Sequence, residues 1–449
     1  MGNENRELHV LFFPFPANGH IIPSIDLARV FASRGIKTTV VTTPLNVPLI
    51  SRTIGKANIK IKTIKFPSHE ETGLPEGCEN SDSALSSDLI MTFLKATVLL
   101  RDPLENLMQQ EHPDWMGFFP TCVSGCVRTY KPQDNVSSWS EPFAVPELPG
   151  EITITKMQLP QTPKHDEVFT KLLDEVNASE LKSHGVIANS FYELEPVYAD
   201  FYRKELGRRA WHLGPVCLSN RDAEEKACRG REAAIDEHEC LKWLDSKEPN
   251  SVVYLCFGSM TAFSDAQLKE IALGLEASGQ NFIWVVKKGL NEKLEWLPEG
   301  FEERILGQGK GLIIRGWAPQ VMILDHESVG GFVTHCGWNS VLEGVCAGVP
   351  MVTWPMYAEQ FYNAKFLTDI VKIGVSVGVQ TWIGMMGRDP VKKEPVEKAV
   401  RRIMVGEEAE EMRNRAKELA RMAKRAVEEG GSSYNDFNSL IEDLRSRAC

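Results

Sequence analysis

The sequence has no run of about 20 apolar residues, the length that a membrane-spanning helix needs. It has no block of basic residues, and its net charge of −11 argues against nucleic acid or an anionic membrane surface as a partner. Its 10 cysteines are scattered, without a CxxC pair or a His and Cys cluster at metal-binding spacing. The sequence therefore predicts no disulfide framework and no metal site, and it favours the reducing cytoplasm as the location.

Two motifs of nucleotide-dependent enzymes are also missing. No GxGxxG turn follows the first apolar strand, which disfavours an NAD-dependent oxidoreductase. No Asp-x-Asp motif is present to hold a metal on a diphosphate. Two Asn-x-Ser sequons, at Asn135 and Asn177, would matter only in a secreted protein, and we interpret them as unused.

The length and composition predict a globular protein with two domains. The chain has 449 residues, of which 43% are apolar and 25% are charged. Such a length is too great for one ordinary core and suits two domains of roughly 200 residues each. Apolar stretches alternate between strand-like and helix-like patterns in both halves, which predicts two Rossmann-like α/β domains. The charged, weakly apolar stretch 218–237 resembles an interdomain linker, so we expect domains at residues 1–235 and 236–449.

The most informative stretch, residues 317–360, reads as a phosphate-binding turn inside a nucleotide pocket. An apolar strand over 331–334 runs into Gly, Asn and Ser and then into a helical pattern over 341–347. Such a turn presents unpaired backbone N–H groups and the positive end of a helix dipole to an anion. The alternative interpretation is an ordinary capped helix, because Asn339 and Ser340 are good N-cap residues.

The residues around this turn favour the nucleotide interpretation. Trp317 offers a flat indole on which a nucleobase can stack. Glu343 lies one turn into the helix, where its carboxylate can accept the hydroxyl groups of a ribose. A second strand, 351–353, ends shortly before the acid and the amide of Glu359 and Gln360. Two strand ends are therefore expected to converge on one ligand.

His20 is the candidate catalytic residue of the first domain. A strand over 8–15, a turn, a helical pattern over 21–33 and a strand over 37–43 form a β-turn-α-β unit. His20 ends the turn, at the carboxyl edge of the sheet, where open α/β sheets bind their ligands. A lone histidine more often caps a helix or bonds a carbonyl, and the functional alternative is a general base.

Residues 317–360 closely resemble the signature segment of plant family-1 UDP-sugar-dependent glycosyltransferases. The match runs without a gap from the first Trp through the HCGWNS core and the following Glu to the closing Glu-Gln pair. The resemblance implies the GT-B fold, in which two Rossmann-like domains face each other across a cleft and the last helix packs back on the first domain. It further implies inverting transfer of a sugar from a UDP-sugar to a hydroxyl of a lipophilic plant metabolite, such as a triterpene sapogenin or a flavonoid. The UDP-sugar is then the donor substrate, no cofactor is needed, and His20 deprotonates the acceptor.

The resemblance also implies roles for individual donor-site residues. Contacts to the uridine are implied for Trp317, Ala318, Gln320 and Glu343. Contacts to the phosphate part of the nucleotide are implied for Ser259, His335, Asn339 and Ser340. Contacts to the sugar hydroxyls are implied for Trp338, Glu359 and Gln360. The two loops also contribute the neighbouring positions Cys336, Gly337, Val341, Leu342, Tyr357 and Ala358. Gln at position 360 favours UDP-glucose, with galactose, xylose and glucuronic acid as open alternatives.

The sequence departs from the family after Asp114. Family members continue with a buried strand that ends in an Asp, and this Asp orients the catalytic imidazole. Here Asp114 is followed at once by Trp115, so roughly 25 to 30 residues, about half of a βαβ unit, are absent. Asp114 should lie at the opposite end of the lost strand and is a poor substitute. Because such an Asp also stabilises the protonated imidazole, the alternative function is a UDP-sugar-binding deletion variant with impaired catalysis.

Overall fold

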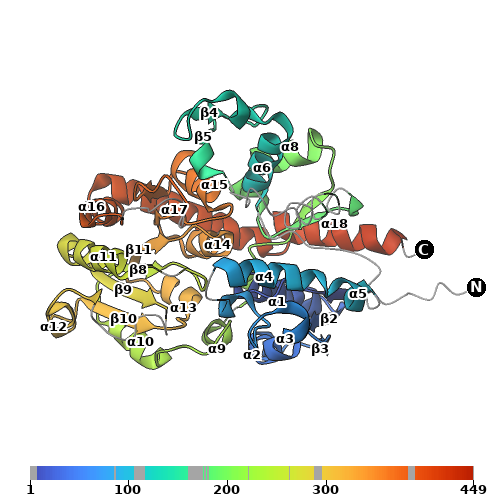
Figure 1. Ribbon diagram of the computed structural model, residues 1–449, viewed down its shortest axis with the longest axis horizontal. Helices are drawn as coiled ribbons and strands as arrows, with labels where there is room; N and C mark the ends of the chain where they lie inside the picture. Colours follow the sequence, from blue (N-terminus) through green and yellow to red (C-terminus); the bar gives the residue numbers. More distant parts are fainter. Residues whose placement is uncertain are drawn as a thin grey trace, which may run out of the picture.

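The computed structural model describes residues 8–84, 87–105, 117–159, 175, 178, 182–220, 222–261, 263–287, 296–382 and 390–447. Figure 1 shows the arrangement of its helices and strands. Asp114 and most of a helix predicted over 166–183 lie outside the described residues.

The second half of the chain forms a six-stranded parallel sheet in the order β10-β9-β8-β11-β12-β13. Its strands are β8 (Val252–Cys256), β9 (Asn281–Val286), β10 (Gly311–Arg315), β11 (Val329–Thr334), β12 (Met351–Thr353) and β13 (Gly374–Ser376). This is the doubly wound strand order. The chain proceeds from β8 at the centre to β10 at one edge, and then from β11 at the centre to β13 at the other edge. Alternate residues of β8 enter two different hydrophobic clusters, so the sheet is buried on both faces. Burial on both faces explains why these strands read as continuous apolar runs.

Eight helices in the described part of this half connect or cover the strands. They are α10 (Glu237–Asp245), α11 (Asp265–Ser278), α12 (Phe301–Gly307), α13 (Gln320–Leu324), α14 (Trp338–Ala347), α15 (Gln360–Lys365), α16 (Lys393–Met404) and α17 (Glu407–Val427).

The first half contains two separate parallel sheets. Three strands pair in the order β1-β2-β3, and two further strands pair as β6-β7. The strands of this half are β1 (His9–Phe12), β2 (Lys37–Thr42), β3 (Ile59–Thr63), β6 (Val186–Ala188) and β7 (Ala210–His212), with a short antiparallel hairpin β4 (Pro142–Ala144) and β5 (Thr153–Thr155). In the second half, β11 lies beside β8. Within the described residues, β1 pairs with β2 alone, and no strand takes the place beside it that corresponds to β11.

One predicted helix of the first half is interrupted. The helices are α1 (Asn18–Ser33), α2 (Val47–Ile54), α3 (His69–Thr72), α4 (Ser87–Val98), α5 (Arg101–Glu105), α6 (Phe118–Tyr130), α8 (Pro196–Lys204) and α9 (Ala223–Cys228). The pattern predicts one helix over 83–110, but α4 ends at Val98 and α5 starts at Arg101. Pro103 has no N–H to donate to the carbonyl of Leu99, so a continuous helix would lose this bond.

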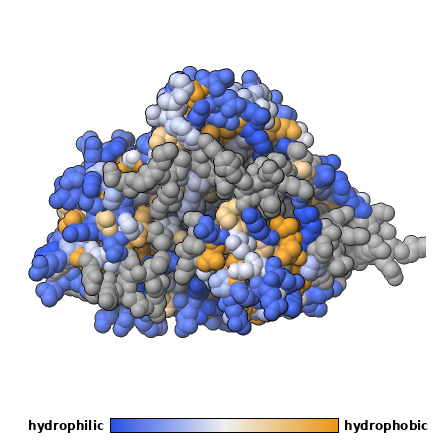
Figure 2. All heavy atoms as spheres, in the orientation of Figure 1, coloured by the Kyte–Doolittle hydropathy of each residue, from blue (hydrophilic) through white to orange (hydrophobic). Residues whose placement is uncertain are grey.

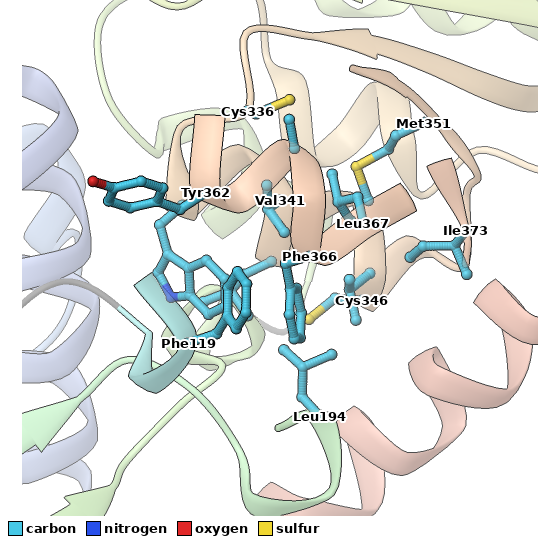
Figure 3. Packing of buried hydrophobic residues seen from close by; sticks show 14 of the residues in the cluster. Phe119, Leu194, Cys336, Val341, Cys346, Met351, Tyr362, Phe366, Leu367 and Ile373 are labelled. Carbon is cyan, nitrogen blue, oxygen red and sulfur yellow. The ribbon is translucent and has the colours of Figure 1, made fainter. Parts of the chain in front are cut away.

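The two halves share a hydrophobic core. Phe119 at the start of α6 lies 5.3 Å, between ring centroids, from Phe366 of the second half. Figure 3 shows Phe119 and Phe366 side by side, with Cys346 and Leu194 close to them. The indole N–H of Trp338 donates to the carbonyl of Asn189 over 2.7 Å, which ties α14 to the end of β6.

The last helix, α18 (Ser432–Arg447), packs on the first half of the chain. In Figure 1 it runs between β1–β3 and the group that contains α6 and α8. The rings of Phe437 and Phe31 lie 4.9 Å apart between centroids. The Asp436 carboxylate accepts hydrogen bonds from Arg203 Nη2 over 2.7 Å and from the backbone N–H of His212 over 2.8 Å.

The stretch 218–237, predicted as a linker, contains the ordered helix α9. Asp222 caps this helix by accepting from the N–H of Glu225 over 2.8 Å. Glu225 forms an ion pair with Arg29 of α1, and Lys226 forms one with Asp325, which follows α13, over 2.6 Å. Charged residues of this stretch therefore form ion pairs with both halves of the molecule.

Candidate active site

The N-terminus of α14 lies where the strands of the second sheet end. Strand β11 is fully buried, and Cys336 just after it has a φ of 65°, an uncommon backbone conformation for a residue other than glycine. Helix α14 begins at Trp338, three residues earlier than the pattern predicts. Its N-cap residue is Gly337, and no side chain caps the helix, so the first-turn N–H groups are left for another acceptor. This arrangement is suited to a phosphate group.

His335 is held between two glycines beside this helix N-terminus. A Cβ atom added to Gly258 or to Gly337 would lie 2.8 or 2.6 Å from its Nε2 atom. Its Nδ1 atom is buried without a hydrogen-bond partner among the described residues. Burial lowers the pKa of His335 to about 4, so the imidazole is neutral near pH 7. Gly258 precedes Ser259 and has a φ of 75°, so the ends of β8 and β11 adjoin at this ring.

A Gly337→Ala substitution is expected to lower the free energy of unfolding by about 1–3 kcal/mol, because its methyl group overlaps the imidazole in a packed site. The φ of Gly337 is −60°, so the backbone itself tolerates alanine. Urea denaturation followed by circular dichroism measures the effect. The matched control is Gly125→Ala in α6, where an added Cβ meets no heavy atom within 4 Å. Equal unfolding free energies for the two variants would contradict the expected overlap.

Asn339 connects the signature turn to the first half of the chain. Its Nδ2 donates to the carbonyl of Gly19 over 2.7 Å, and its Oδ1 accepts from Asn189 Nδ2 over 3.2 Å. The Gly19 carbonyl is available because Pro23, four residues on in α1, has no N–H. Asn339 therefore spans from the first turn of α1 to the end of β6.

His20 lies in the first turn of α1, next to this bridge. The pattern predicts His20 at the end of the turn before this helix. The helix starts at Asn18, so His20 belongs to the helix instead. The His20 ring is half-buried and packs edge-on against Phe15 with 5.4 Å between centroids. Its Nδ1 atom is buried and has no hydrogen-bond partner among the described residues. Burial lowers the pKa of His20 to about 4. A carboxylate bonded to Nδ1 would raise this pKa and fix the ring.

Both histidines should make stability depend on pH. Their pKa is lowered from 6.5 to about 4 by burial, so only the unfolded chain takes up these protons between those values. The free energy of unfolding therefore contains a contribution from keeping these two histidines neutral. This contribution is fully present above about pH 6.5 and is lost as the pH falls toward 4. The buried carboxyl of Glu195 has the opposite effect, because burial raises its pKa to about 7. We expect wild-type protein to lose more thermal stability between pH 7 and pH 4.5 than His335→Asn does. Parallel melting curves would contradict this expectation.

The residues predicted to hold the uridine lie together. Gln320 Nε2 donates to Glu343 Oε2 over 2.6 Å and to Ser340 Oγ over 3.1 Å. Trp317 and Ala318 directly precede this group, and Ala318 is buried. The structure therefore brings the carboxylate that is predicted to bind the ribose, the amide of Gln320 and the start of α14 into one cluster.

The cluster also contains a residue that the sequence pattern did not single out. Arg229, just after α9, donates from Nη1 to Glu343 Oε1 over 2.6 Å and from Nε to Asp26 Oδ2 over 2.8 Å. Burial lowers the pKa of Arg229, but the carboxylates of Asp26 and Glu343 outweigh it and leave that pKa above its ordinary value. The next residue, Gly230, lies directly against the indole of Trp317.

The residues predicted to hold the sugar lie at the end of β12 and at the start of α14. Ala358 has a φ of 54°, so both donor loops contain a residue other than glycine in the left-handed region. Gln360 is buried, and its Oε1 accepts from the N–H groups of Met356 and Tyr357 over 2.9 and 3.1 Å. The neighbouring Glu359 accepts from Asn363 Nδ2 over 3.4 Å. Trp338 is buried and its indole N–H is bonded to Asn189, so a sugar contact would use its backbone.

Two further properties concern possible ligands. Within the described residues, no group of three or more His, Cys, Asp or Glu side chains is arranged to hold a metal ion. None of the described helices is both long enough and apolar enough to cross a bilayer.

The fold and the site together define a class of enzyme. A doubly wound domain offers an uncapped helix N-terminus, and a second α/β unit brings a histidine to it. This is the arrangement of a GT-B transferase that uses a sugar nucleotide. A family model described as "UDP-glucoronosyl and UDP-glucosyl transferase" matches residues 205–419.

Comparison with curated proteins identifies the family. The chain is 50% identical to UDP-glucose flavonoid 3-O-glucosyltransferase 7 of Fragaria ananassa, over 99% of this chain and 97% of the relative. It is 51% identical to UDP-glycosyltransferase 73B3 of Arabidopsis thaliana, over 98% of this chain and 99% of the relative. The chain therefore belongs to the plant family-1 UDP-glycosyltransferases. It is a UDP-glycosyltransferase, and a UDP-sugar is its donor.

Solved structures agree with the GT-B fold. The crystal structure of Glycyrrhiza uralensis UGT73P12 with glycyrrhetinic acid 3-O-monoglucuronide matches with a TM-score of 0.88 and 38% identity, over 98% of this chain and 96% of that chain. Medicago truncatula UGT71G1 with UDP-glucose matches with a TM-score of 0.76 and 26% identity, over 99% and 100% of the two chains.

The alignments also reveal a difference in length. They extend over 471 positions with scopoletin glucosyltransferase of Nicotiana tabacum and over 488 with UDP-glycosyltransferase 73B4 of Arabidopsis thaliana. This chain has only 449 residues, so even the alignment over 471 positions leaves at least 22 without a counterpart here. The shortfall is about the size of the segment predicted to be missing after Asp114.

Proposed function

We propose that this protein is an inverting O-glycosyltransferase that moves glucose from UDP-glucose to a hydroxyl group of a lipophilic plant metabolite. The observation that carries the proposal is the hydrogen bond from Asn339 to the carbonyl of Gly19 over 2.7 Å. It puts the first turn of α1, with His20, beside the uncapped N-terminus of α14. The base and the phosphate end of the donor are thereby neighbours, as one in-line displacement requires.

In the proposed reaction, His20 takes the proton of the attacking hydroxyl. Its Nε2 is the nitrogen left for the substrate, because Nδ1 is enclosed. The hydroxyl oxygen attacks the anomeric carbon while the bond from that carbon to UDP breaks, so the configuration inverts. Negative charge grows on the departing UDP, and the N–H groups at the start of α14 would stabilise it together with Ser259 and Ser340. No cofactor beyond the donor is needed in this proposal.

The acceptor class rests on the relatives and on the surface of the first half. The relatives' names include flavonoid, anthocyanin and scopoletin glucosyltransferases, and one solved relative is bound to glycyrrhetinic acid 3-O-monoglucuronide. Helix α4 keeps Ile90, Met91 and Leu94 partly exposed. Hydrophobic atoms also gather near α4 on the face that Figure 2 shows. A flavonoid or a triterpene sapogenin fits such an apolar surface.

We also propose that the boundary between the two domains lies near residue 235 and that the protein is located in the cytoplasm.

A second candidate is a protein that binds the donor but transfers its sugar slowly. The observation in its favour is His20 Nδ1, which is buried without a partner among the described residues. Burial lowers the pKa of the imidazole to about 4, far below the pH at which it would be an efficient base.

One experiment separates the two candidates. UDP release from UDP-glucose is measured with a panel of flavonoids and sapogenins, beside calorimetric binding of UDP to the same preparation. Turnover that disappears in His20→Ala supports the transferase. UDP binding without turnover supports the impaired variant. Absence of both would refute the donor site.

A further inference from the structure

The buried side chain of Arg229 joins three parts of the chain. Its guanidinium contacts Asp26 of α1 over 2.8 Å and Glu343 of α14 over 2.6 Å. The side chains are 9%, 0% and 6% exposed, so the group is shielded from water and from salt. Two carboxylates share one cation, and Asp26 is held further by Asn220 Nδ2 over 2.8 Å.

The chain after Arg229 runs along the base-stacking residue. Gly230 has a φ of 93°, and a Cβ at this position would overlap the indole of Trp317, so only glycine fits. Four residues on, the N–H of Ala234 donates to the carbonyl of Trp317 over 2.8 Å. We call residues 229–234 the linker strap. It engages the two residues, Trp317 and Glu343, to which the uracil and the ribose are assigned.

The strap is attached at its start to the first half. The N–H of Gly230 donates to Thr53 Oγ1 over 3.1 Å, and the preceding helix α9 is fixed by the ion pairs of Glu225 and Lys226. Arg229 uses different nitrogens for its two partners, Nε for Asp26 and Nη1 for Glu343. It can therefore release Glu343 while the bond to Asp26 remains.

We propose that the linker strap competes with the donor for the uridine end of the site, and that Arg229 thereby sets the affinity for UDP-sugars. This inference rests on the proposed function of Trp317 and Glu343. The ribose hydroxyls replace Arg229 Nη1 on Glu343, and the uracil replaces Gly230 on Trp317. Asp26 acts as the pivot that keeps Arg229 paired when Glu343 is released. The apparent affinity for UDP is reduced by the fraction of molecules in which the strap is closed.

The test compares UDP binding in variants that release the strap. Arg229→Met removes the contact to Glu343, and Arg229→Met with Asp26→Asn also removes the buried charge left without a partner. We expect the Kd for UDP to fall about tenfold or more, as for a strap closed in at least about nine molecules in ten. The KM for UDP-glucose should fall with it. The control is Arg231→Met, because Arg231 belongs to the same segment but is 48% exposed and 3.9 Å from Asp82. Its Kd should match wild type.

Limited trypsin digestion gives a second readout, since cleavage after Arg231, whose side chain is 48% exposed, requires the backbone of the strap to leave the site. UDP should accelerate this cleavage in wild-type protein. An unchanged or higher Kd in both Arg229 variants would overturn the proposal, because Arg229 would then be neutral or would help to hold the donor. Absence of UDP binding in wild type and in both variants would refute the donor site itself, and the strap with it.

Discussion

Insertion of the missing strand is expected to raise kcat for glucosyl transfer by about 10³- to 10⁴-fold, the scale on which a catalytic histidine depends on its orienting carboxylate. The insert is the corresponding segment of scopoletin glucosyltransferase of Nicotiana tabacum, which is 50% identical to this chain, placed after Asp114. Two structural observations support the direction of the effect. His20 Nδ1 has no partner in the described part of the chain, and Asn339 bridges the first turn of α1, which follows β1, and the end of β6. A strand between β1 and β6 would therefore end close to His20.

The measurement is initial-rate kinetics at saturating UDP-glucose with the best acceptor of the panel. A matched insert whose strand-ending Asp is replaced by Asn separates orientation of the imidazole from repair of the sheet. Both inserts should raise the melting temperature, because backbone groups at the edge of β1 gain partners. Only the insert with Asp should restore kcat. Equal rates for both inserts would show that His20 does not depend on this carboxylate.

His20→Ala is expected to lower kcat by about 10²-fold in the natural chain and by about 10⁴-fold in the chain with the insert, the range that general bases supply. The two changes act on one catalytic unit, so their effects should not add. In the natural chain, burial lowers the pKa of His20 to about 4 and little of its capacity as a base is used. Stopped assays of UDP release measure kcat for the natural chain, for the chain with the insert and for the His20→Ala variant of each.

Calorimetry of UDP controls for damage to the donor site. The Kd should be the same with and without the His20 side chain, since the proposed donor contacts come from the second half and His20 acts on the acceptor. Equal fold-losses of kcat in the natural chain and in the chain with the insert would show that His20 and the inserted Asp do not act as one catalytic unit. A Kd that rises with His20→Ala would place His20 in donor binding instead.

The sequence predicted the donor site because its elements are local. An apolar run followed by glycines identifies β11, and the helix after it is α14, although Gly337 lets that helix start at Trp338. The prediction of one helix over 83–110 was wrong, because it gave no weight to Pro103, which cannot donate a backbone hydrogen bond within a continuous helix. The position of Pro23 likewise indicates that the carbonyl of Gly19 needs a partner, although not which one.

The partners of Arg229 could not be predicted in this way. They lie 203 and 114 residues away in the sequence, at Asp26 and Glu343. A charged stretch such as 218–237 normally indicates a solvated surface, and only the packing of both halves around α9 buries this arginine. Sequence pattern therefore predicted the elements of the candidate donor site, whereas the ion pairs of Arg229 depend on tertiary contacts.

Helix α18 has a consequence for biosynthesis. Its 16 residues are translated after the strands of both halves, yet Phe437, Leu440 and Ile441 complete the cluster around Phe12 and Phe31. The amino-terminal half is therefore translated first, but its hydrophobic cluster is completed only after the second sheet has been translated. Until α18 leaves the exit tunnel, that cluster stays open, and a nascent chain with an exposed apolar surface is a substrate for chaperones. A premature stop codon before Ser432 would leave the second half able to fold while the half that is made first remains incomplete.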